Sequence, residues 1–146
     1  MTLAPLAVAA RPAPLPAWRK LGLAAEILAL YSRVRWNLRH NDIRRVLAHV
    51  RGSTPADERN ADAAENVAGL RFGHAVTRVL TALPVDARCL MQSLVLCGLL
   101  ARRGVRSSVV IGVRPGADFG AHAWVELRDC PLLPPQDDEF ERLLVL

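Results

Sequence analysis

The sequence predicts an α+β fold, in which helices come first and short strands follow. Apolar residues recur at helical spacing through much of 18–103, and from Ser107 the chain changes to short β-branched or alternating segments. With 146 residues, 51% of them apolar and 23% charged, the chain has the size and composition of one globular domain. Helices followed by strands are typical of an α+β architecture.

Three helices are predicted before Pro84, which ends the third because proline disfavours helix at the preceding residue. The first covers 18–31 and the second about 41–50. The third covers 63–83, and the polar segment 52–62 before it is predicted to be a loop. The apolar face of the third helix is expected to contain Val67, Leu70, Val76, Val79 and Leu80.

The best-marked helix is the fourth, predicted at 87–103. Asp86 is the expected N-cap, and Gly104 the expected residue just past the C-terminus. The second helix has a similar signal, with Asn41 or Asp42 available as its cap. Both helices are therefore predicted from their ends as well as from their apolar residues.

Strands are predicted at 107–113 and 121–127, joined by the turn-rich loop 114–120. A third, short strand is predicted at Pro131–Leu133, near an edge because proline lacks an N–H to donate. The sheet is thus expected to follow the fourth helix directly.

The chain is divided here into a flexible Ala/Pro-rich N-terminus at 1–17 and one domain at 18–146, whose part 18–62 is helical and basic. Residues 11–51 hold nine Arg or Lys against two acids, and residues 129–146 hold five acids against one Arg. Solvated helix faces account for arginines spread in this way. A basic helical domain that binds nucleic acid through its arginines stays open as an alternative.

Several classes of protein are disfavoured by what the sequence lacks. No uncharged run reaches the roughly 20 apolar residues of a membrane span. The N-terminus has no positive region ahead of its apolar run, and Pro5 interrupts that run, so a cytoplasmic location is expected. The cysteines Cys89, Cys97 and Cys130 match neither a disulfide framework nor a zinc pattern. No metal and no cofactor are therefore expected.

Two residues have the setting that nucleophilic chemistry needs. Cys89 falls near the start of the fourth helix, where free N–H groups and the helix dipole favour a thiolate. Cys97 lies two turns further inside and is expected in the core, and Cys130 is expected as an incidental thiol in a turn. His122 opens an alternating strand and shares its face with Trp124 and Glu126. His40, His49 and His74 lie on helical segments and are predicted to be surface residues.

Spacing alone leaves two interpretations of these residues open. A Cys at a helix start and a His on a strand can form the nucleophile and base of a hydrolase. They can equally be a packed Cys and a hydrogen-bonded His, because such spacings do not transfer between families.

The stretch 87–127 contains RCL followed by Ser93, a helix ending LLARRGV, the strand VVIGVR and the motif AHAWVEL. With these features it resembles the transglutaminase-like leader peptidases of lasso-peptide biosynthesis, the C-terminal part of the B protein. The resemblance implies a papain/transglutaminase-like core, with Cys89 at a helix N-terminus and His122 on an antiparallel strand.

The resemblance also implies an activity and partners. A cysteine protease of this kind removes the leader peptide from a ribosomally made lasso-peptide precursor before macrocyclisation. The precursor is its substrate, and an ATP-dependent cyclase acts next. This chain has no room for a leader-recognition module before residue 18, so it is similar to the split form, in which a separate recognition protein holds the leader.

The site residues follow from the same resemblance. Cys89 is the nucleophile, His122 the base, and Trp124, on the same strand face, lines the cleft or covers the core. The family's third member is an Asp on the strand after the His, where this chain has Pro134. Asp137 is taken as the third member here; the other acids nearby are Asp129, expected in a turn, and Asp138, and Gln136 is a neutral substitute. An amidase or transglutaminase with the same Cys and His remains an alternative function.

Overall fold

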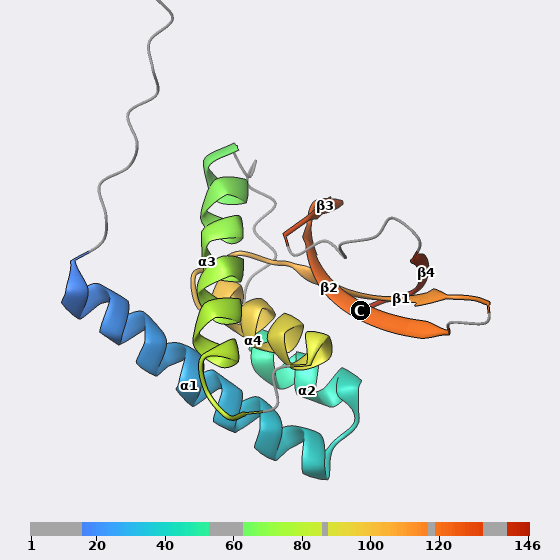
Figure 1. The fold of residues 1–146 in the computed structure, drawn as a ribbon, viewed down its shortest axis with the longest axis horizontal. Helices are drawn as coiled ribbons and strands as arrows, with labels where there is room; N and C mark the ends of the chain where they lie inside the picture. The colour runs from blue at the N-terminus through green and yellow to red at the C-terminus, as the bar shows by residue number, and fades with distance from the viewer. Residues whose placement is uncertain (1–15, 53–62, 86–87, 117–118, 133–139) are drawn as a thin grey trace, which may run out of the picture.

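The structure of the protein is a computed structural model that describes residues 16–52, 63–85, 88–116, 119–132 and 140–146. Within these ranges four helices precede a four-stranded antiparallel sheet, which confirms the α+β prediction. The helices lie on one side and the strands on the other (Figure 1). The elements are α1 (Ala17–His40), α2 (Ile43–Arg51), α3 (Ala63–Thr81), α4 (Cys89–Ala101), β1 (Ser108–Arg114), β2 (Gly120–Leu127), β3 (Cys130–Pro131) and β4 (Glu141–Val145).

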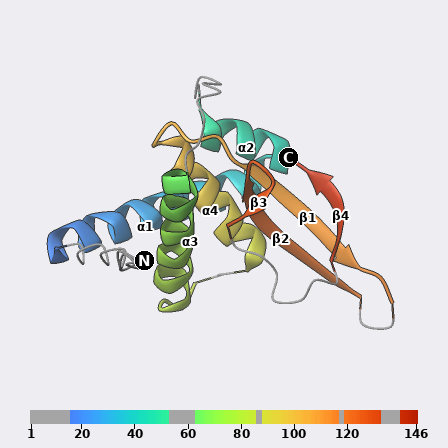
Figure 2. The same ribbon diagram turned by 90° about the horizontal axis from the view of Figure 1, so that it is seen from above.

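Helix α4 is the centre of the molecule. It contacts α1, α2, α3 and the two long strands, and both views show it between the other helices and the sheet (Figures 1 and 2). Nine of its 13 residues are buried, on all sides of the helix. A helix that is apolar all round has to be covered on every face. The strongest apolar segment of the sequence therefore becomes the axis around which the rest packs.

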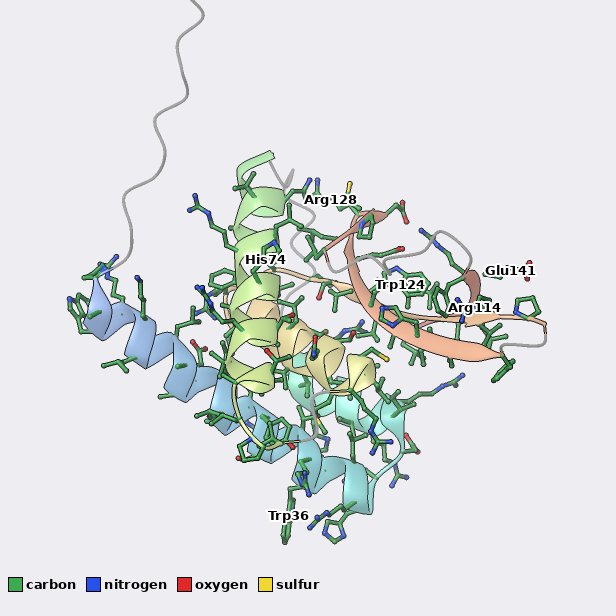
Figure 3. The ribbon with its side chains drawn as sticks, in the orientation of Figure 1. Trp36, His74, Arg114, Trp124, Arg128 and Glu141 are labelled. Atoms are coloured by element: carbon green, nitrogen blue, oxygen red, sulfur yellow. The ribbon has the colours of Figure 1, made fainter. Side chains whose placement is uncertain are left out.

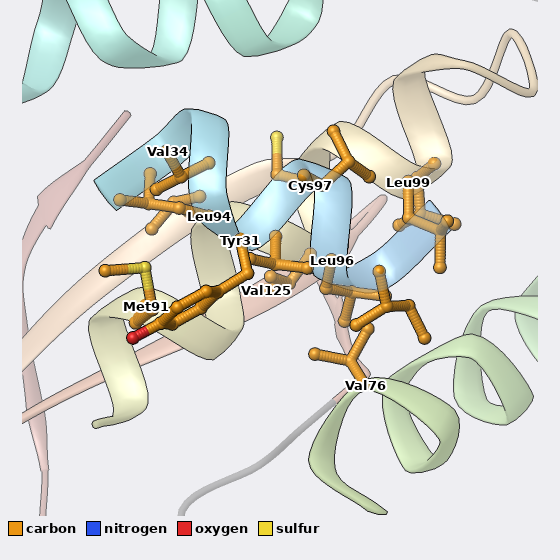
Figure 4. Close-up of a cluster of buried hydrophobic side chains, with 14 of the residues drawn as sticks. Tyr31, Val34, Val76, Met91, Leu94, Leu96, Cys97, Leu99 and Val125 are labelled. Carbon is orange, nitrogen blue, oxygen red and sulfur yellow. The ribbon is translucent and has the colours of Figure 1, made fainter. Parts of the chain in front are cut away.

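The core consists of apolar side chains from every helix and from the sheet (Figure 4). Tyr31 of α1, Val76 of α3 and Val125 of β2 all meet residues of α4 there. Helices α2 and α4 come very close at Gly98, because a Cβ added to this glycine would lie 2.8 Å from Cγ1 of Val50. Each large side chain buried in this way contributes about 1.5–3 kcal/mol relative to its exposed state.

The sheet has the strand order β3-β2-β1-β4. In the hairpin of β1 and β2, Gly112 is opposite His122 and Val109 is opposite Val125. Val109, Val125 and Leu127 belong to the core under the helices. Because side chains alternate along a strand, the even-numbered residues of β2 lie on the other face of the sheet. The prediction of strands near 107–113 and 121–127 is confirmed.

The first two helices agree with the sequence in type and differ in length. Helix α1 continues to His40, beyond the predicted end at residue 31, because Val34 extends the buried stripe and no residue before Asn41 interrupts the helix. The cap of α2 is Asp42, whose Oδ1 accepts the backbone N–H of Arg45 at 2.9 Å. The predicted loop 52–62 falls almost wholly outside the described residues, as does most of the N-terminal segment 1–17.

The buried face of α3 differs from the predicted one. Val76 and Leu80 are buried as predicted, but Val67 and Leu70 are exposed, and Gly69 and Gly73 are buried on the face that packs inward. The reason is Leu132, whose methyl groups lie 3.0 Å from where a Cβ of Gly69 would be. The glycine makes a close approach possible, and this rotates the larger apolar residues out towards solvent.

Helix α4 also begins later than predicted. Its first residue is Cys89 and Arg88 occupies the N-cap position without a capping side chain, whereas Asp86 lies outside the described residues. Cys89 is therefore the first residue of the helix and not the third. At the other end Gly104 has a φ of +74°, as expected for the glycine that follows a helix.

At the C-terminal end the strands differ from the predicted ones in two ways. The predicted third strand at Pro131–Leu133 is the two-residue β3 at Cys130–Pro131. Strand β4 was not predicted at all, because ERLLV lacks the alternation of a half-buried strand. It forms by pairing with β1, and Leu146 continues this pairing with Val109 through two backbone hydrogen bonds. Across the described residues, no helix is long and apolar enough to cross a membrane.

Replacing a core residue of α4 tests this architecture. Leu96 is fully buried, so Leu96→Ala is expected to lower the free energy of unfolding by about 2–5 kcal/mol. Leu21→Ala, on the exposed side of α1, is the matched control and is expected to change it by less than about 0.5 kcal/mol. Urea unfolding followed by circular dichroism measures both, and equal losses would contradict the central burial of α4.

Candidate functional site

Cys89 starts the central helix and is half-buried, while nine of the 12 residues that follow it in the helix are buried. The first N–H groups of an α-helix have no partner within the helix. The thiol and these N–H groups therefore lie together at one end of α4. A carbonyl attacked by the sulfur would find hydrogen-bond donors there for the oxygen that becomes negative.

His122 lies near the start of β2, directly opposite Gly112. Its ring is half-buried and contacts two aromatic rings, those of Trp124 and Phe140. The ring centroids are 6.1 Å and 5.5 Å away, respectively. Burial lowers the pKa of the His122 imidazole below its ordinary value of 6.5. At neutral pH the ring is therefore uncharged, which is the form that accepts a proton.

The helix start and the strand that carries His122 are neighbours. In both views the end of α4 that begins at Cys89 lies beside β2 (Figures 1 and 2). Strand β3 pairs only with Glu126 and Leu127, so in the described chain no strand covers the edge of β2 beside His122. Among the described residues Cys89 and His122 make no hydrogen bond to each other. The catalytic pair stays a prediction, supported by the placement of the two elements.

The face of β2 that carries His122 contains a polar network that the sequence did not reveal. Trp124, labelled on β2 in Figure 3, is buried, and its Nε1–H donates to Oε1 of Glu126 at 2.8 Å. Arg142 of β4 donates to the same oxygen at 2.8 Å. Alternation did place His122, Trp124 and Glu126 on one face. The contributions of Phe140 and Arg142 were missed because β4 itself was missed.

The predicted role of Trp124 in binding substrate stays a prediction. The indole is 4% exposed, and its N–H is already bonded to Glu126. In the structure Trp124 is therefore a buried side chain that covers part of one face of the sheet.

Among the described residues, no carboxylate makes a direct hydrogen bond or ion pair with His122. Glu126 is four residues away on the same strand, which at the usual rise is about 13 Å, and Trp124 lies between them. Asp129 is exposed in the turn after β2, as predicted, at the opposite end of the strand. Asp137 and Asp138 lie outside the described residues. The third member at Asp137 therefore also stays a prediction.

The other cysteines and histidines have the predicted kinds of environment. Cys97 is buried in the core and Cys130 is exposed, although in the short β3 and not in a turn. The three remaining histidines, His40, His49 and His74, are exposed, and Figure 3 labels His74 on α3. In the described ranges no group of three or more His, Cys, Asp or Glu residues is arranged to hold a metal ion.

A small pocket lies near the far end of α4. Arg51, Cys97 and Ser107 are among its lining residues, and neither Cys89 nor His122 is. Arg51 crosses this region and donates to the carbonyl oxygens of Ser107 and Leu146 at 2.9 and 2.7 Å. These bonds tie α2 to the sheet, so the pocket belongs to a structural junction and not to the Cys89–His122 region.

The lowered pKa of His122 makes a prediction about stability. As the pH falls, the unfolded chain takes up the proton first, near the ordinary value of 6.5, because burial opposes protonation in the native state. The wild type is therefore expected to lose stability relative to His122→Gln as the pH falls through 6.5, until the native imidazole is protonated too. Urea unfolding at a series of pH values measures this, and a constant difference between the two proteins would contradict it.

The sequence was compared with known proteins. A family model described as the transglutaminase-like superfamily matches residues 8–145, which is nearly the whole chain. In the same comparisons no curated protein and no solved structure matches it. The matched range includes the central helix that starts at Cys89 and all four strands of the sheet. The chain belongs to the transglutaminase-like superfamily.

Proposed function

We propose that this protein is a cysteine peptidase that removes the leader peptide from a ribosomally made lasso-peptide precursor. Transglutaminase-like proteins are typically cysteine-dependent enzymes, which supports Cys/His acyl-transfer or protease chemistry. One observation carries the assignment to these two residues. Cys89 is the first residue of the central helix, and this helix end lies beside the strand of His122. The choice of precursor rests on the resemblance of 87–127 to the leader peptidases.

The proposed reaction uses two residues and one water molecule. His122 takes the proton of the Cys89 thiol, and the sulfur attacks the carbonyl carbon at the junction of leader and core. The oxyanion accepts hydrogen bonds from the backbone N–H groups at the start of α4. The C–N bond then breaks as His122 returns the proton to the leaving amine, which gives a thioester on Cys89.

Hydrolysis of the thioester completes the cycle. His122 accepts a proton from water, and the oxygen attacks the thioester carbon. The C–S bond breaks, the sulfur regains its proton from His122, and the leader leaves as a carboxylic acid. The neutral state of the ring at pH 7 suits it to both proton transfers.

The proposed partners follow from the split form of these systems. A separate recognition protein would present the leader, and the ATP-dependent cyclase would receive the core peptide with its new amino terminus. Cleavage by the isolated chain is therefore expected to accelerate when the recognition protein is added.

A second candidate uses the same residues for a different acceptor. Membership of the superfamily favours acyl transfer in general, so an amine in place of water would make the protein a transglutaminase, and a simple amide substrate would make it an amidase. Trapping experiments with a primary amine separate these outcomes. A peptide–amine adduct in excess over the hydrolysed acid would favour the transglutaminase.

Removing the thiol tests the nucleophile. Cys89→Ala is expected to lower the rate of precursor cleavage by at least about 10³-fold, because the covalent step needs the sulfur. Cys130→Ala removes an exposed thiol and serves as the control with an unchanged rate. Cleavage is followed by mass spectrometry of precursor and recognition protein together. Near-normal cleavage by a folded Cys89→Ala variant would rule out the mechanism.

Substitutions of Asp137 and of the adjacent Asp138 test whether Asp137 is the third catalytic residue. Asp137→Asn is expected to reduce kcat by about 10²–10⁴-fold, because a carboxylate that orients His122 also stabilises the imidazolium. Asp138→Asn has the same change of charge at the next position and is expected to keep kcat within about threefold, because only one carboxylate orients the imidazole in the proposed triad. Steady-state kinetics measure both, and equal effects would exclude Asp137 as the orienting residue.

A further inference from the structure

We propose that Glu126 is a positioning residue for His122 and acts through the indole of Trp124. This inference rests on the proposed function of His122 as the base, and it deepens that function. Four contacts carry it, and they run from the imidazole to the surface of the sheet. In order, they are His122 to Trp124, Trp124 to Gly112, Trp124 to Glu126, and Glu126 to Arg142.

The first contact fixes one face of the imidazole. The rings of His122 and Trp124 are nearly parallel, with an interplanar angle of 18° and centroids 6.1 Å apart. This distance lies in the range in which aromatic pairs attract each other. Phe140 touches the imidazole as well, with centroids 5.5 Å apart, and Arg114 of β1 lies over the ring of Phe140. Aromatic packing therefore restrains the rotation of the His122 side chain.

The second contact fixes the indole against the sheet. A Cβ on Gly112 would lie 2.7 Å from the Cη2 and Cζ3 atoms of Trp124, closer than any real packing allows. The six-membered ring of the indole thus lies against the backbone of β1 at the position directly opposite His122. Only glycine leaves room for the ring here, so the close contact between β1 and the indole depends on Gly112.

The third contact fixes the direction of the indole. Tryptophan has one hydrogen-bond donor, and a buried indole needs a partner for it. Here Nε1–H donates to Oε1 of Glu126 at 2.8 Å. Turning the indole over would break this bond and leave the donor unsatisfied in a buried place, which is costly because a buried donor without a partner has lost its hydrogen bonds to water.

The fourth contact explains why a carboxylate is present. Glu126 is 4% exposed, and a charged group is costly to bury unless it is paired. Arg142 donates to the same Oε1 atom at 2.8 Å from the half-exposed surface of β4. Hydrogen bonds to a charged acceptor are roughly twice as strong as neutral ones. The ion pair therefore fixes the position of the Glu126 carboxylate. The carboxylate in turn orients the indole of Trp124, and the indole restrains the imidazole of His122.

Two substitutions at Glu126 separate shape from hydrogen bonding. Glu126→Gln keeps an oxygen where Oε1 stands, so the indole retains its partner. Glu126→Leu removes the acceptor and releases the indole. Trp124→Phe keeps an aromatic ring but loses the N–H, and the exposed Glu141→Gln on β4 is the control for loss of a carboxylate.

Two readouts are needed, one that depends on activity and one that does not. Glu126→Leu and Trp124→Phe are expected to lower kcat by about 10–10²-fold with KM nearly unchanged, the size of effect that a small misplacement of a catalytic group produces. Glu126→Gln is expected to recover most of this loss. NMR titration of the His122 ring is expected to show its pKa rising towards 6.5 in the two disrupted variants, because a released ring gains solvent.

The outcomes distinguish this inference from a purely structural role. A folded Glu126→Leu or Trp124→Phe variant with the kcat and the His122 titration of the wild type would overturn it. If the Glu126→Leu variant does not fold, the kcat and the His122 titration of the Trp124→Phe variant decide the outcome. If the wild type cleaves no precursor but the titration of His122 still shifts in Trp124→Phe, the positioning stands and the proposed function fails.

Discussion

Complete burial of α4 is the constraint on which the other elements depend. The helix has no polar face over residues 93–100, so three helices and a sheet have to surround it. Gly98 allows α1 and α2 to approach closely enough to do so. At the C-terminal end Arg103 pairs with Glu26 of α1 and lies over the ring of Phe72 of α3, which links that end to two neighbouring helices. The start of the helix is less enclosed, and there the half-buried Cys89 carries the thiol.

The two faces of strand β2 have different roles. One face completes the core, through Val125 and Leu127. The other carries His122 and a buried polar network that the core could not accommodate. Because the period of a strand is two residues, a single alternating segment supplies both faces. The same segment thereby links the stability of the fold to the position of the imidazole.

The surroundings of His122 are mostly aromatic. In the described chain its neighbours are the rings of Trp124 and Phe140, and burial keeps the pKa of the imidazole low. A neutral ring of fixed orientation is what a base for a thiol requires. The ion pair between the buried Glu126 and the half-exposed Arg142 acts on the imidazole only through the neutral indole, and so it adds no charge next to the imidazole. Such an arrangement restrains the ring and leaves its proton affinity to burial.

The sequence by itself determined the elements whose signals are local. The cap of α2 at Asn41 or Asp42, the all-apolar helix after Cys89 and the alternation around His122 depend on neighbouring residues only. Tertiary structure decided the rest. The buried face of α3 follows from the approach of Leu132 to Gly69, and β4 exists because β1 offers it hydrogen bonds. Phe140 and Arg142 reach the site through that pairing, which spans a long stretch of chain. No local pattern encodes a contact of this kind, because its energy is gained only when the distant partner is in place.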